Sequence, residues 1–247
     1  MATSAFSLEG RTIGEWTVGP VTARPIGATG GNFSCCYPVL HKDGTRAFLK
    51  ALDFSKALGA PDPVSALMVM TEAYDFERSV LRECKARRMD RVVAAIDDGK
   101  IDADKSVPGS VPGSVPVPYL IFEWADRDLR SQIGAVANID LAWKLRSLHH
   151  MATGLRQLHN NAIAHQDLKP SNVLVFDNSI SKIADVGCAS KRGAVCPRDG
   201  LNFAGGPAYA PPELFYGYLD PEWSTRRLGC DAYLGPTSQE QTSLGLT

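Results

Sequence analysis

The chain has 247 residues, of which 44% are hydrophobic and 21% are charged, and its formal net charge is −1. That length suits one large domain or two small lobes, and the composition is typical of a globular protein. The near-neutral charge argues against binding to nucleic acid or an anionic membrane, and no apolar run approaches the ~20 residues that span a bilayer.

The N-terminal residues, MATSAFSLEGRTIGEW, lack the basic stretch and apolar core of a secretory signal peptide. The cysteines form no CxxC pair, so the sequence predicts neither a zinc site nor a disulfide framework. They are Cys35, Cys36, Cys84, Cys188, Cys196 and Cys230. Free thiols are usual in a reducing compartment, and we therefore expect a cytoplasmic protein.

The first half of the chain is predicted to be rich in strands, with one long helix. YPVL and AFLKALD flank the turn HKDG and predict a hairpin. Residues 64–87 have apolar side chains at helical spacing and predict a helix. Two more strand-like pieces follow, RVVAAID and PYLIFEW, separated by a stretch in which VPGS is repeated. Proline and glycine at that density cannot hold a strand ladder, so we expect a solvated insertion at 106–118.

The second half is predicted to begin with a helix, because apolar residues recur at helical spacing from Leu145 to Leu158. The breaker HNNAIAH ends this helix, and NVLVF and SKIAD predict two short strands around the turn DNS. From Gly187 to Pro212 the chain is rich in glycine and proline, which predicts irregular structure. Residues 236–247 are polar and lack periodicity, and we expect them to form a disordered tail.

The segment HQDLKPSNVLVFD, residues 165–177, has three side chains of the kinds that phosphoryl transfer needs. Asp167 supplies a carboxylate for the attacking hydroxyl, Lys169 supplies a cation, and Asn172 supplies an oxygen ligand for magnesium. A second carboxylate, Asp185 in IADVG, follows after two short strands that can return it to the same place. Gly187 permits the backbone turn after it. Taken alone, the H-x-D pattern also fits a turn that ends a helix.

Together these segments resemble the protein kinase family. HQDLKPSN is similar to the catalytic loop H-R-D-L-K-P-x-N, and IADVG is similar to the magnesium-binding D-F-G. The resemblance implies that Asp167 is the catalytic base, that Lys169 steadies the γ-phosphate, and that Asn172 and Asp185 hold Mg²⁺. The Lys-Pro pair is the serine/threonine-type variant of the loop.

The resemblance also implies the fold. We expect an α+β, bilobal protein-kinase-like fold, with an antiparallel β N-lobe containing one helix, a mainly α C-lobe, and ATP between them. The expected boundaries are 1–122 for the N-lobe, 123–235 for a partial C-lobe and 236–247 for the tail.

Upstream of the catalytic loop, AFLK is similar to the family's V-A-I-K strand. The resemblance makes Lys50 the ligand of the ATP α- and β-phosphates, although a lysine at a strand end is otherwise usually solvated surface. We expect Glu77 on the predicted helix to pair with Lys50. Leu81, four residues later, then lies on the same helix face and packs inward.

YLIFEWADRDLRSQI is similar to the hinge between the two kinase lobes. An adenine ring needs two backbone hydrogen bonds and apolar walls. The resemblance assigns the bonds to the Glu123 carbonyl and the Ala125 amide, the floor of the adenine pocket to Leu174, and its back wall to Phe122. An ordinary buried strand is the alternative for the aromatic residues taken singly.

The phosphate-covering loop is expected at Gly27, Gly30 and Gly31. These glycines do not follow the family's G-x-G-x-x-G pattern, and a plain hairpin turn also fits them. Phe48 stands two residues before Lys50, where the family usually has alanine, and a benzyl group there narrows the adenine pocket.

Two further departures lie near the catalytic aspartate. Gln166 replaces the arginine that normally pairs with a phosphate on the activation loop, so we expect activity that does not depend on phosphorylation at a site such as Ser190. Gly206 replaces a threonine whose hydroxyl contacts that aspartate. GGPAYAPPE is similar to the family's substrate-binding loop, and the resemblance implies that Glu213 is a buried carboxylate and that Asp231 holds the backbone of the catalytic loop.

After Tyr233 the family continues through several helices, whereas here a short polar tail follows. Three explanations stay open: the chain is a fragment, its end has been replaced, or a partner completes the C-lobe. We expect low stability. The predicted function is transfer of the γ-phosphate of Mg²⁺-ATP to serine or threonine hydroxyls of protein substrates. The alternatives are a pseudokinase that binds nucleotide or proteins and, last, a small-molecule phosphotransferase.

Overall fold

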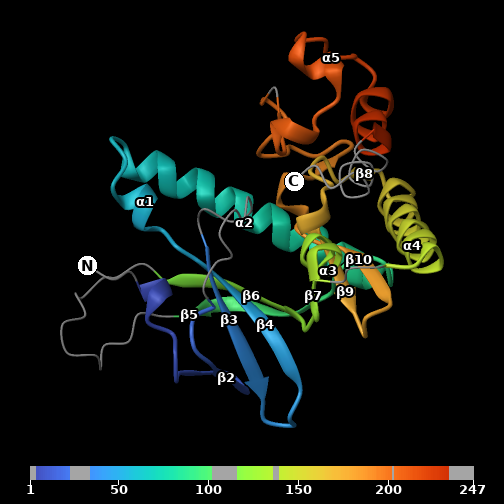
Figure 1. Ribbon diagram of the computed structural model, residues 1–247. Coiled ribbons are helices and arrows are strands. Elements are labelled where there is room, and N and C mark those ends of the chain that lie inside the picture. The colour runs from blue at the N-terminus through green and yellow to red at the C-terminus, as the bar shows by residue number, and fades with distance from the viewer. Residues whose placement is uncertain (1–3, 23–33, 102–115, 136–138, 202, 234–247) are drawn as a thin grey trace. The chain divides into compact units, whose positions relative to one another are not determined.

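The computed structural model divides into two compact units, one formed by Met1–Arg78 with Ala94–Trp124 and the other by Ser79–Val93 with Ala125–Thr247. The residues that it describes, shown in colour in Figure 1, are 4–22, 34–101, 116–135, 139–201 and 203–233. The predicted insertion at 106–118 and the predicted tail at 236–247 lie wholly or mostly outside them. Among the described helices, none is long and apolar enough to cross a bilayer.

The first unit is built on one antiparallel sheet in the order β1-β2-β3-β4-β6-β5 (Figure 1). Helix α2 begins in this unit, and its last turns group with the second unit. The elements are η1 (Ser4–Phe6), β1 (Thr12–Ile13), β2 (Trp16–Val18), β3 (Ser34–His41), β4 (Arg46–Leu52), α1 (Ser55–Leu58), α2 (Pro63–Ala86), β5 (Ala95–Ile101) and β6 (Val117–Glu123).

The β3–β4 hairpin confirms the strands predicted on either side of HKDG. The turn depends on Gly44, whose φ of 91° is open to glycine, and on Asp43, whose side chain accepts the Thr45 backbone N–H at 2.8 Å. Along β4, Ala47 and Leu49 are fully buried in the core of the unit. Because side chains alternate across a strand, the residues between and after them face the other side of the sheet.

The strand predicted from RVVAAID begins later than expected, at Ala95. Val92 and Val93 are buried, but they pair with the second unit's strand β10. The backbone of Val93 donates to the Ile183 carbonyl at 2.8 Å, and Val92 forms an isolated parallel bridge with Ile183. The apolar run thus marks a buried connection rather than the start of a strand. The same contacts explain why 79–93 groups with the second unit, although 1–122 was the expected N-lobe.

The second unit contains helices and short strands, in a three-stranded sheet β10-β9-β7 and a two-stranded sheet β11-β8. Its elements are β7 (Arg127–Asp128), α3 (Leu129–Ala135), α4 (Leu141–His159), β8 (Ile163–Ala164), η2 (Pro170–Asn172), β9 (Val173–Phe176), β10 (Ile180–Ile183), η3 (Val186–Cys188), β11 (Ser190–Lys191), η4 (Pro207–Tyr209), α5 (Pro212–Phe215) and the π-helical η5 (Ser224–Leu228).

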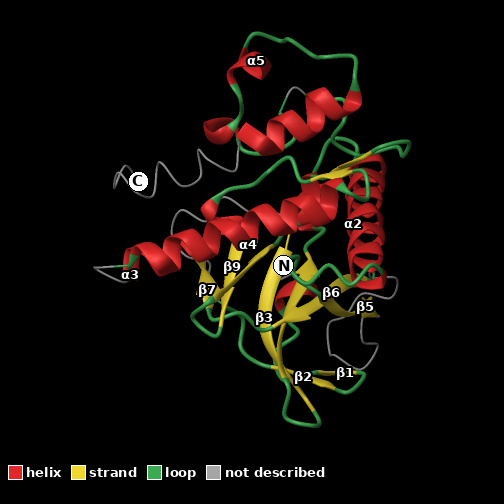
Figure 2. Cartoon of the chain, turned by 90° about the vertical axis from the view of Figure 1, so that its right-hand side faces the viewer, coloured by secondary structure: helices red, strands yellow, loops and turns green. Residues whose placement is uncertain are grey.

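Helix α4, drawn in red in Figure 2, is the long helix predicted from the apolar spacing of this region. The Asp140 side chain caps it by accepting the Trp143 backbone N–H at 2.6 Å. The helix packs closely on β10 because Gly154 has no side chain there. A Cβ on Gly154 would lie 2.7 Å from the Arg91 carbonyl and 2.9 Å from Ile183 Cδ1.

The core of the second unit joins the segment after α4 to the rest of the unit. Leu168, which lies between two of the predicted site residues, is fully buried in this core. Its neighbours there include Leu129, Met151, Val173, Ile183 and Cys230. Burial of one leucine contributes ~2 kcal/mol, which helps hold the loop in a single conformation. The α+β fold class predicted from the sequence is confirmed.

Candidate active site

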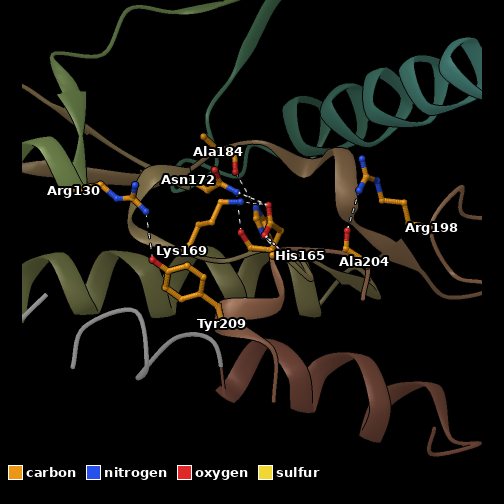
Figure 3. Close-up of polar contacts among 10 residues, drawn as sticks. Arg130, His165, Lys169, Asn172, Ala184, Arg198, Ala204 and Tyr209 are labelled. Atoms are coloured by element: carbon orange, nitrogen blue, oxygen red, sulfur yellow. Dashed lines mark hydrogen bonds and ion pairs between the residues drawn. The ribbon is translucent and has the colours of Figure 1, made fainter. Parts of the chain in front are cut away.

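The carboxylate of Asp167 is the centre of a compact polar cluster in the second unit, and its residue is only 6% exposed. Oδ2 accepts hydrogen bonds from Lys169 Nζ at 2.7 Å and from Asn172 Nδ2 at 3.0 Å. Oδ1 accepts the backbone N–H of Gly206 at 2.8 Å. Figure 3 shows Lys169 and Asn172 side by side at this point. The sequence assigned four polar residues of this unit to catalysis and metal binding, and three of them, Asp167, Lys169 and Asn172, are thus brought together.

The backbone of this loop is fixed by Asp231, which is fully buried. Its Oδ2 accepts the His165 N–H at 2.7 Å, and its Oδ1 accepts the Gln166 N–H at 2.7 Å. His159 Nε2 lies 2.8 Å from Oδ2. Gln166 has a φ of 67°, which is uncommon for a residue other than glycine and needs such support. The predicted contact between Asp231 and the loop backbone is therefore present.

Asp185 follows directly after a backbone segment that is tied to the same loop. The Ala184 N–H donates to the Asn172 carbonyl at 2.8 Å, and the Ala184 carbonyl lies 2.9 Å from His165 Nε2 (Figure 3). Asp185 itself has a φ of 61°, in the left-handed region. These ties bring the chain back to the Asp167 cluster after the β9–β10 hairpin, as its length predicted.

Cys188 lies within electrostatic reach of both carboxylates. Burial is the main cause that raises the pKa of its thiol to about 12; the negative charges of Asp167 and Asp185 act in the same direction, and Arg198 and Lys169 act against them. One thiol thus responds to two aspartates that are far apart in the sequence. The Ala184 bonds to Asn172 and His165 place the residue before Asp185 beside the Asp167 loop.

The donor set suits a hard divalent cation. Asn172 uses its Nδ2 as a donor to Asp167, to the carbonyl at 2.8 Å as well as to Oδ2, which leaves its side-chain oxygen as the ligand atom. Asp185 adds a carboxylate. Mg²⁺ is usually held by one or two such oxygens, with water and substrate phosphates completing its coordination. These two residues therefore fit a magnesium ion that arrives with a phosphorylated substrate.

In the first unit, Lys50 and Glu77 form the pair expected from the sequence. Lys50 Nζ lies 2.8 Å from Oε1 and 3.2 Å from Oε2 of Glu77, and the Glu77 side chain is only 9% exposed. Lys50 lies on β4 on the face opposite the buried Ala47 and Leu49, and Phe48 is on that same face. The register pairs Lys50 with Cys36 and Leu120.

The remaining predicted nucleotide contacts lie on β6, on β9 and in the segment between the two units in the sequence. Glu123 ends β6, where its backbone N–H and its side chain bond to Ala94 at 3.2 Å and 2.8 Å. Ala125 is half-buried and begins the second unit's last segment, and Leu174 is half-buried on β9 between Val173 and Val175, which face the core. Gly27, Gly30 and Gly31 lie outside the described residues, and so their role stays a prediction.

The structure contradicts one expectation about the Gly/Pro-rich segment and bears on a second. Glu213 is exposed rather than buried, because Pro212–Phe215 is a short helix on the surface. Ser190 is 1% exposed and accepts a hydrogen bond from Trp223 Nε1 at 3.1 Å. A buried hydroxyl of this kind is closed to a modifying enzyme, so replacing Ser190 would test packing and not phosphorylation.

Sequence reasoning missed two residues that contact the loop around Asp167. A Cβ on Gly205 would lie 2.5 Å from the Gln166 carbonyl and 2.6 Å from Asp167 Oδ1, so only glycine fits there. The paired glycines of GGPAYAPPE were the available signal for this close approach. Arg227 donates from Nη1 to Gln166 Oε1 at 3.1 Å, and no pattern in the sequence pointed to it.

Comparison with known protein families shows which family the chain belongs to. The family model of the protein kinase domain matches residues 24–225. The chain belongs to the protein kinase family. This confirms the resemblance seen in HQDLKPSN and IADVG, and it covers both the Lys50–Glu77 pair and the Asp167 cluster.

Curated relatives of this kinase family member are similar over shorter stretches. It is 34% identical over 85 residues to the serine/threonine-protein kinase PTK2 of Candida glabrata, covering 32% of this chain and 11% of the relative. It is 32% identical over 120 residues to the CTD kinase subunit alpha of Saccharomyces cerevisiae, covering 47% and 22%. It is 30% identical over 109 residues to cyclin-dependent kinase 9 of Danio rerio, covering 41% and 28%. The matched part thus spans less than a third of each relative's length.

Proposed function

We propose that this protein transfers the γ-phosphate of ATP to serine or threonine hydroxyls of protein substrates, with Mg²⁺ as cofactor. The single observation that carries the proposal is the convergence of Lys169, Asn172 and Gly206 on the carboxylate of Asp167. The names of the relatives, which are serine/threonine and cyclin-dependent kinases, support the substrate class.

Asp167 would receive the acceptor hydroxyl. Oδ2 already accepts from two side chains, whereas Oδ1 accepts only the Gly206 N–H among the described residues and can take a second donor. A substrate hydroxyl bonded to Oδ1 would be oriented for attack, which is the main task of a carboxylate in phosphoryl transfer. We therefore propose that the fixed position of Asp167 contributes to the rate of phosphate transfer.

The cations would act on the phosphates. Lys169, buried at 3% exposure beside Asp167, is a point charge for the transferred group, and Lys50 would bind the phosphates nearer the ribose, with Glu77 holding it in place. When bound, Mg²⁺ offsets the negative charge that develops on the phosphate oxygens. Asn172 and Asp185 would supply its protein ligands, and Glu123, Ala125 and Leu174 would contact the adenine.

The test is a phosphate-transfer assay with the full chain, Mg²⁺ and ATP labelled on its γ-phosphate. We expect transfer to serine or threonine of a generic protein substrate, at least about a hundredfold slower in Asp167→Asn. Asp177→Asn is the matched control, since Asp177 is an exposed turn residue with a φ of 49° that asparagine also adopts. Absence of transfer by the unaltered chain would refute the proposal.

A thermal-shift titration separates nucleotide binding from transfer. We expect ATP with Mg²⁺ to raise the melting temperature, and Asp185→Ala to remove the Mg²⁺-dependent part of that increase. Binding without transfer would mean that the domain recognises nucleotide but is no kinase. A cytoplasmic location is also our proposal. It is supported by the six free thiols and is tested by imaging a tagged chain in cells.

A further inference from the structure

A buried arginine connects the Gly/Pro-rich segment to the residue that precedes Asp167. Arg227 lies in η5 and is 6% exposed. Its Nη2 forms an ion pair with Asp199 Oδ1 at 2.7 Å and also donates to the Asp199 carbonyl at 3.1 Å. Both contacts start from Nη2, and they hold this end of the guanidinium against Asp199.

On its other side, Arg227 forms a reciprocal pair with Gln166. Arg227 Nη1 donates to Gln166 Oε1 at 3.1 Å, and Gln166 Nε2 donates to the Arg227 carbonyl at 2.8 Å. Gln166 is itself 6% exposed and holds the unusual φ of 67° next to Asp167. A continuous chain of polar contacts thus runs from Asp199 through Arg227 to Gln166, the residue that directly precedes Asp167.

The positive charge of Arg227 needs a counter-charge, and Asp199 provides it. A buried guanidinium without a partner is strongly unfavourable. Asp231 is close to Gln166, but both of its oxygens already accept backbone N–H groups of the loop. Arg226 adds a second positive charge nearby: burial lowers the pKa of its guanidinium, and the charge of Arg227 lowers it further. Asp199 acts against this lowering, so its carboxylate interacts with both arginines.

The carboxylate of Asp199 is part of the sequence and needs no modifying enzyme. Between Asp185 and Glu213 the sequence contains only two hydroxyl side chains, Ser190 and Tyr209. Ser190 is buried, and Tyr209 is half-buried with its hydroxyl oxygen 3.4 Å from Arg130 Nη2 (Figure 3). The segment therefore presents no exposed serine or threonine that could take a phosphate and supply a switchable charge.

We propose that Asp199 is a positioning residue that fixes Asp167 through Arg227 and Gln166, so that the kinase site is held in its working form without phosphorylation of the segment 185–213. The inference rests on the proposed function, because the consequence of this positioning is a rate of phosphate transfer. The arrangement also explains how glutamine can stand at position 166, where the family has arginine. The positive charge is supplied by Arg227 of η5 instead.

The test compares phosphate transfer by the full chain and its Asp199→Asn, Asp199→Glu and Asp177→Asn variants. We expect Asp199→Asn to lower kcat by about thirtyfold or more with little change in the KM for ATP, because the ATP contacts are elsewhere. Asp199→Glu, which keeps the charge, should recover most of the rate, and Asp177→Asn should match the unaltered chain. A kcat of Asp199→Asn within about twofold of the unaltered chain would overturn the proposal.

Rescue by an added anion distinguishes a charge effect from damage to the fold. In Asp199→Ala, inorganic phosphate at millimolar concentration should bind beside Arg227 and raise kcat, whereas the same phosphate should not raise kcat of the unaltered chain. Failure of both phosphate and Asp199→Glu to restore rate would show that the residue matters only for packing, against the proposal.

Hydrogen exchange gives a readout that does not depend on activity. The backbone N–H groups of residues 165–168 should exchange faster in Asp199→Asn than in Asp177→Asn. The exchange is measured at a denaturant concentration at which thermal melts show that both variants are folded. If the unaltered chain transfers no phosphate, the proposed function fails, and this measurement still decides the positioning. Equal exchange in the two variants would refute the link from Asp199 to the catalytic loop.

Discussion

The backbone N–H of Gly206 donates a hydrogen bond of 2.8 Å to Oδ1 of Asp167, across 39 positions of the sequence. The preceding residue, Gly205, lies still closer, with no space for a Cβ between its Cα and the catalytic loop. A segment that was predicted to be irregular is therefore packed directly on the proposed catalytic carboxylate. Its backbone supplies one of the three donors that orient this carboxylate.

Gly205→Ala and Gly206→Ala form a matched pair of substitutions. The added methyl group on Gly205 would lie 2.6 Å from Asp167 Oδ1, so it must displace the carboxylate, and we expect kcat to fall by about a hundredfold. On Gly206, with φ −70°, the nearest of these atoms is 3.7 Å away, and the rate should stay within about twofold. Steady-state kinetics would check this, and equal rates in the two variants would contradict the geometry.

The sequence predicted the residues within one loop or helix of this site better than the contacts from distant segments that hold them in place. Motif spacing located Asp167, Lys169 and Asn172, because these groups lie on one loop whose order along the chain is also its order in space. The Lys50–Glu77 pair was predictable because helical periodicity showed which glutamate shares a face with Leu81. Such inferences need only short-range geometry.

Contacts between distant segments were not predictable in the same way. Nothing in the residue types around Arg227 shows that it bonds to Gln166, 61 positions earlier, because that depends on how η5 packs. Likewise, Val92 and Val93 have the composition of a strand, and only the tertiary contact with Ile183 shows that they do not start one. Glu213 was assigned by motif alone, and its exposure depends on packing that the motif does not specify.

The ion pair of Lys50 leads to a second prediction. In Glu77→Gln the lysine keeps a hydrogen-bond acceptor but loses the charge that fixes it, and the pair is only partly exposed, at 20% and 9% for the two side chains. We expect the KM for ATP to rise and kcat/KM to fall by about tenfold or more, since Lys50 would then point at the phosphates less often. Glu72→Gln on the same helix is the control, and equal effects of the two changes would count against the assigned pair.

Phe48 provides a third prediction, about nucleotide affinity. It is half-buried on β4, on the sheet face that also carries Lys50, and it pairs in register with Pro38 and Phe122. Phe48→Ala removes a benzyl group from this face, and we expect ATP to bind about three- to tenfold more tightly because the adenine needs that space. Calorimetric titration with ATP and Mg²⁺ would measure the change, and weaker binding would show instead that Phe48 contacts the nucleotide favourably.

His150 predicts a pH dependence of stability. It is 8% exposed in α4, its Nδ1 accepts the Ser181 N–H at 3.2 Å, and burial lowers its pKa from 6.5, with Arg91, His149 and Arg146 acting in the same direction and Asp90 against it. The folded state therefore disfavours the charged ring. Its contribution to stability is complete above pH 6.5 and is lost as the pH falls through 6.5 toward the lower folded-state pKa.

Urea denaturation at about pH 7.5 and about pH 5.5 would measure this effect as a difference in the free energy of unfolding. We expect the unaltered chain to lose more stability on acidification than His150→Gln, which has no ring to titrate. His149→Gln is the matched control, because His149 is exposed on the same helix. If His150→Gln and the unaltered chain lose the same free energy, the histidine does not contribute to acid sensitivity.

Cys188 gives a test of the site that needs no activity at all. Because burial, followed by the charge of Asp167, raises the pKa of this thiol to about 12, almost none of it is thiolate at about pH 8. Cys188 is half-buried, as Cys36 is, and because of its raised pKa we expect iodoacetamide to modify Cys188 only slowly in the folded chain, as followed by mass spectrometry. Asp167→Asn removes one neighbouring negative charge, so it should raise the modification rate of Cys188 moderately, while Asp177→Asn should leave it unchanged.

Burial is the larger cause of the raised pKa of Cys188, and it stays in place in Asp167→Asn. A modification rate that reached that of an exposed thiol would therefore mean that the loop had opened. A rate in Asp167→Asn equal to that of the control would place Cys188 beyond the reach of the Asp167 carboxylate and would contradict the arrangement on which the proposed chemistry depends.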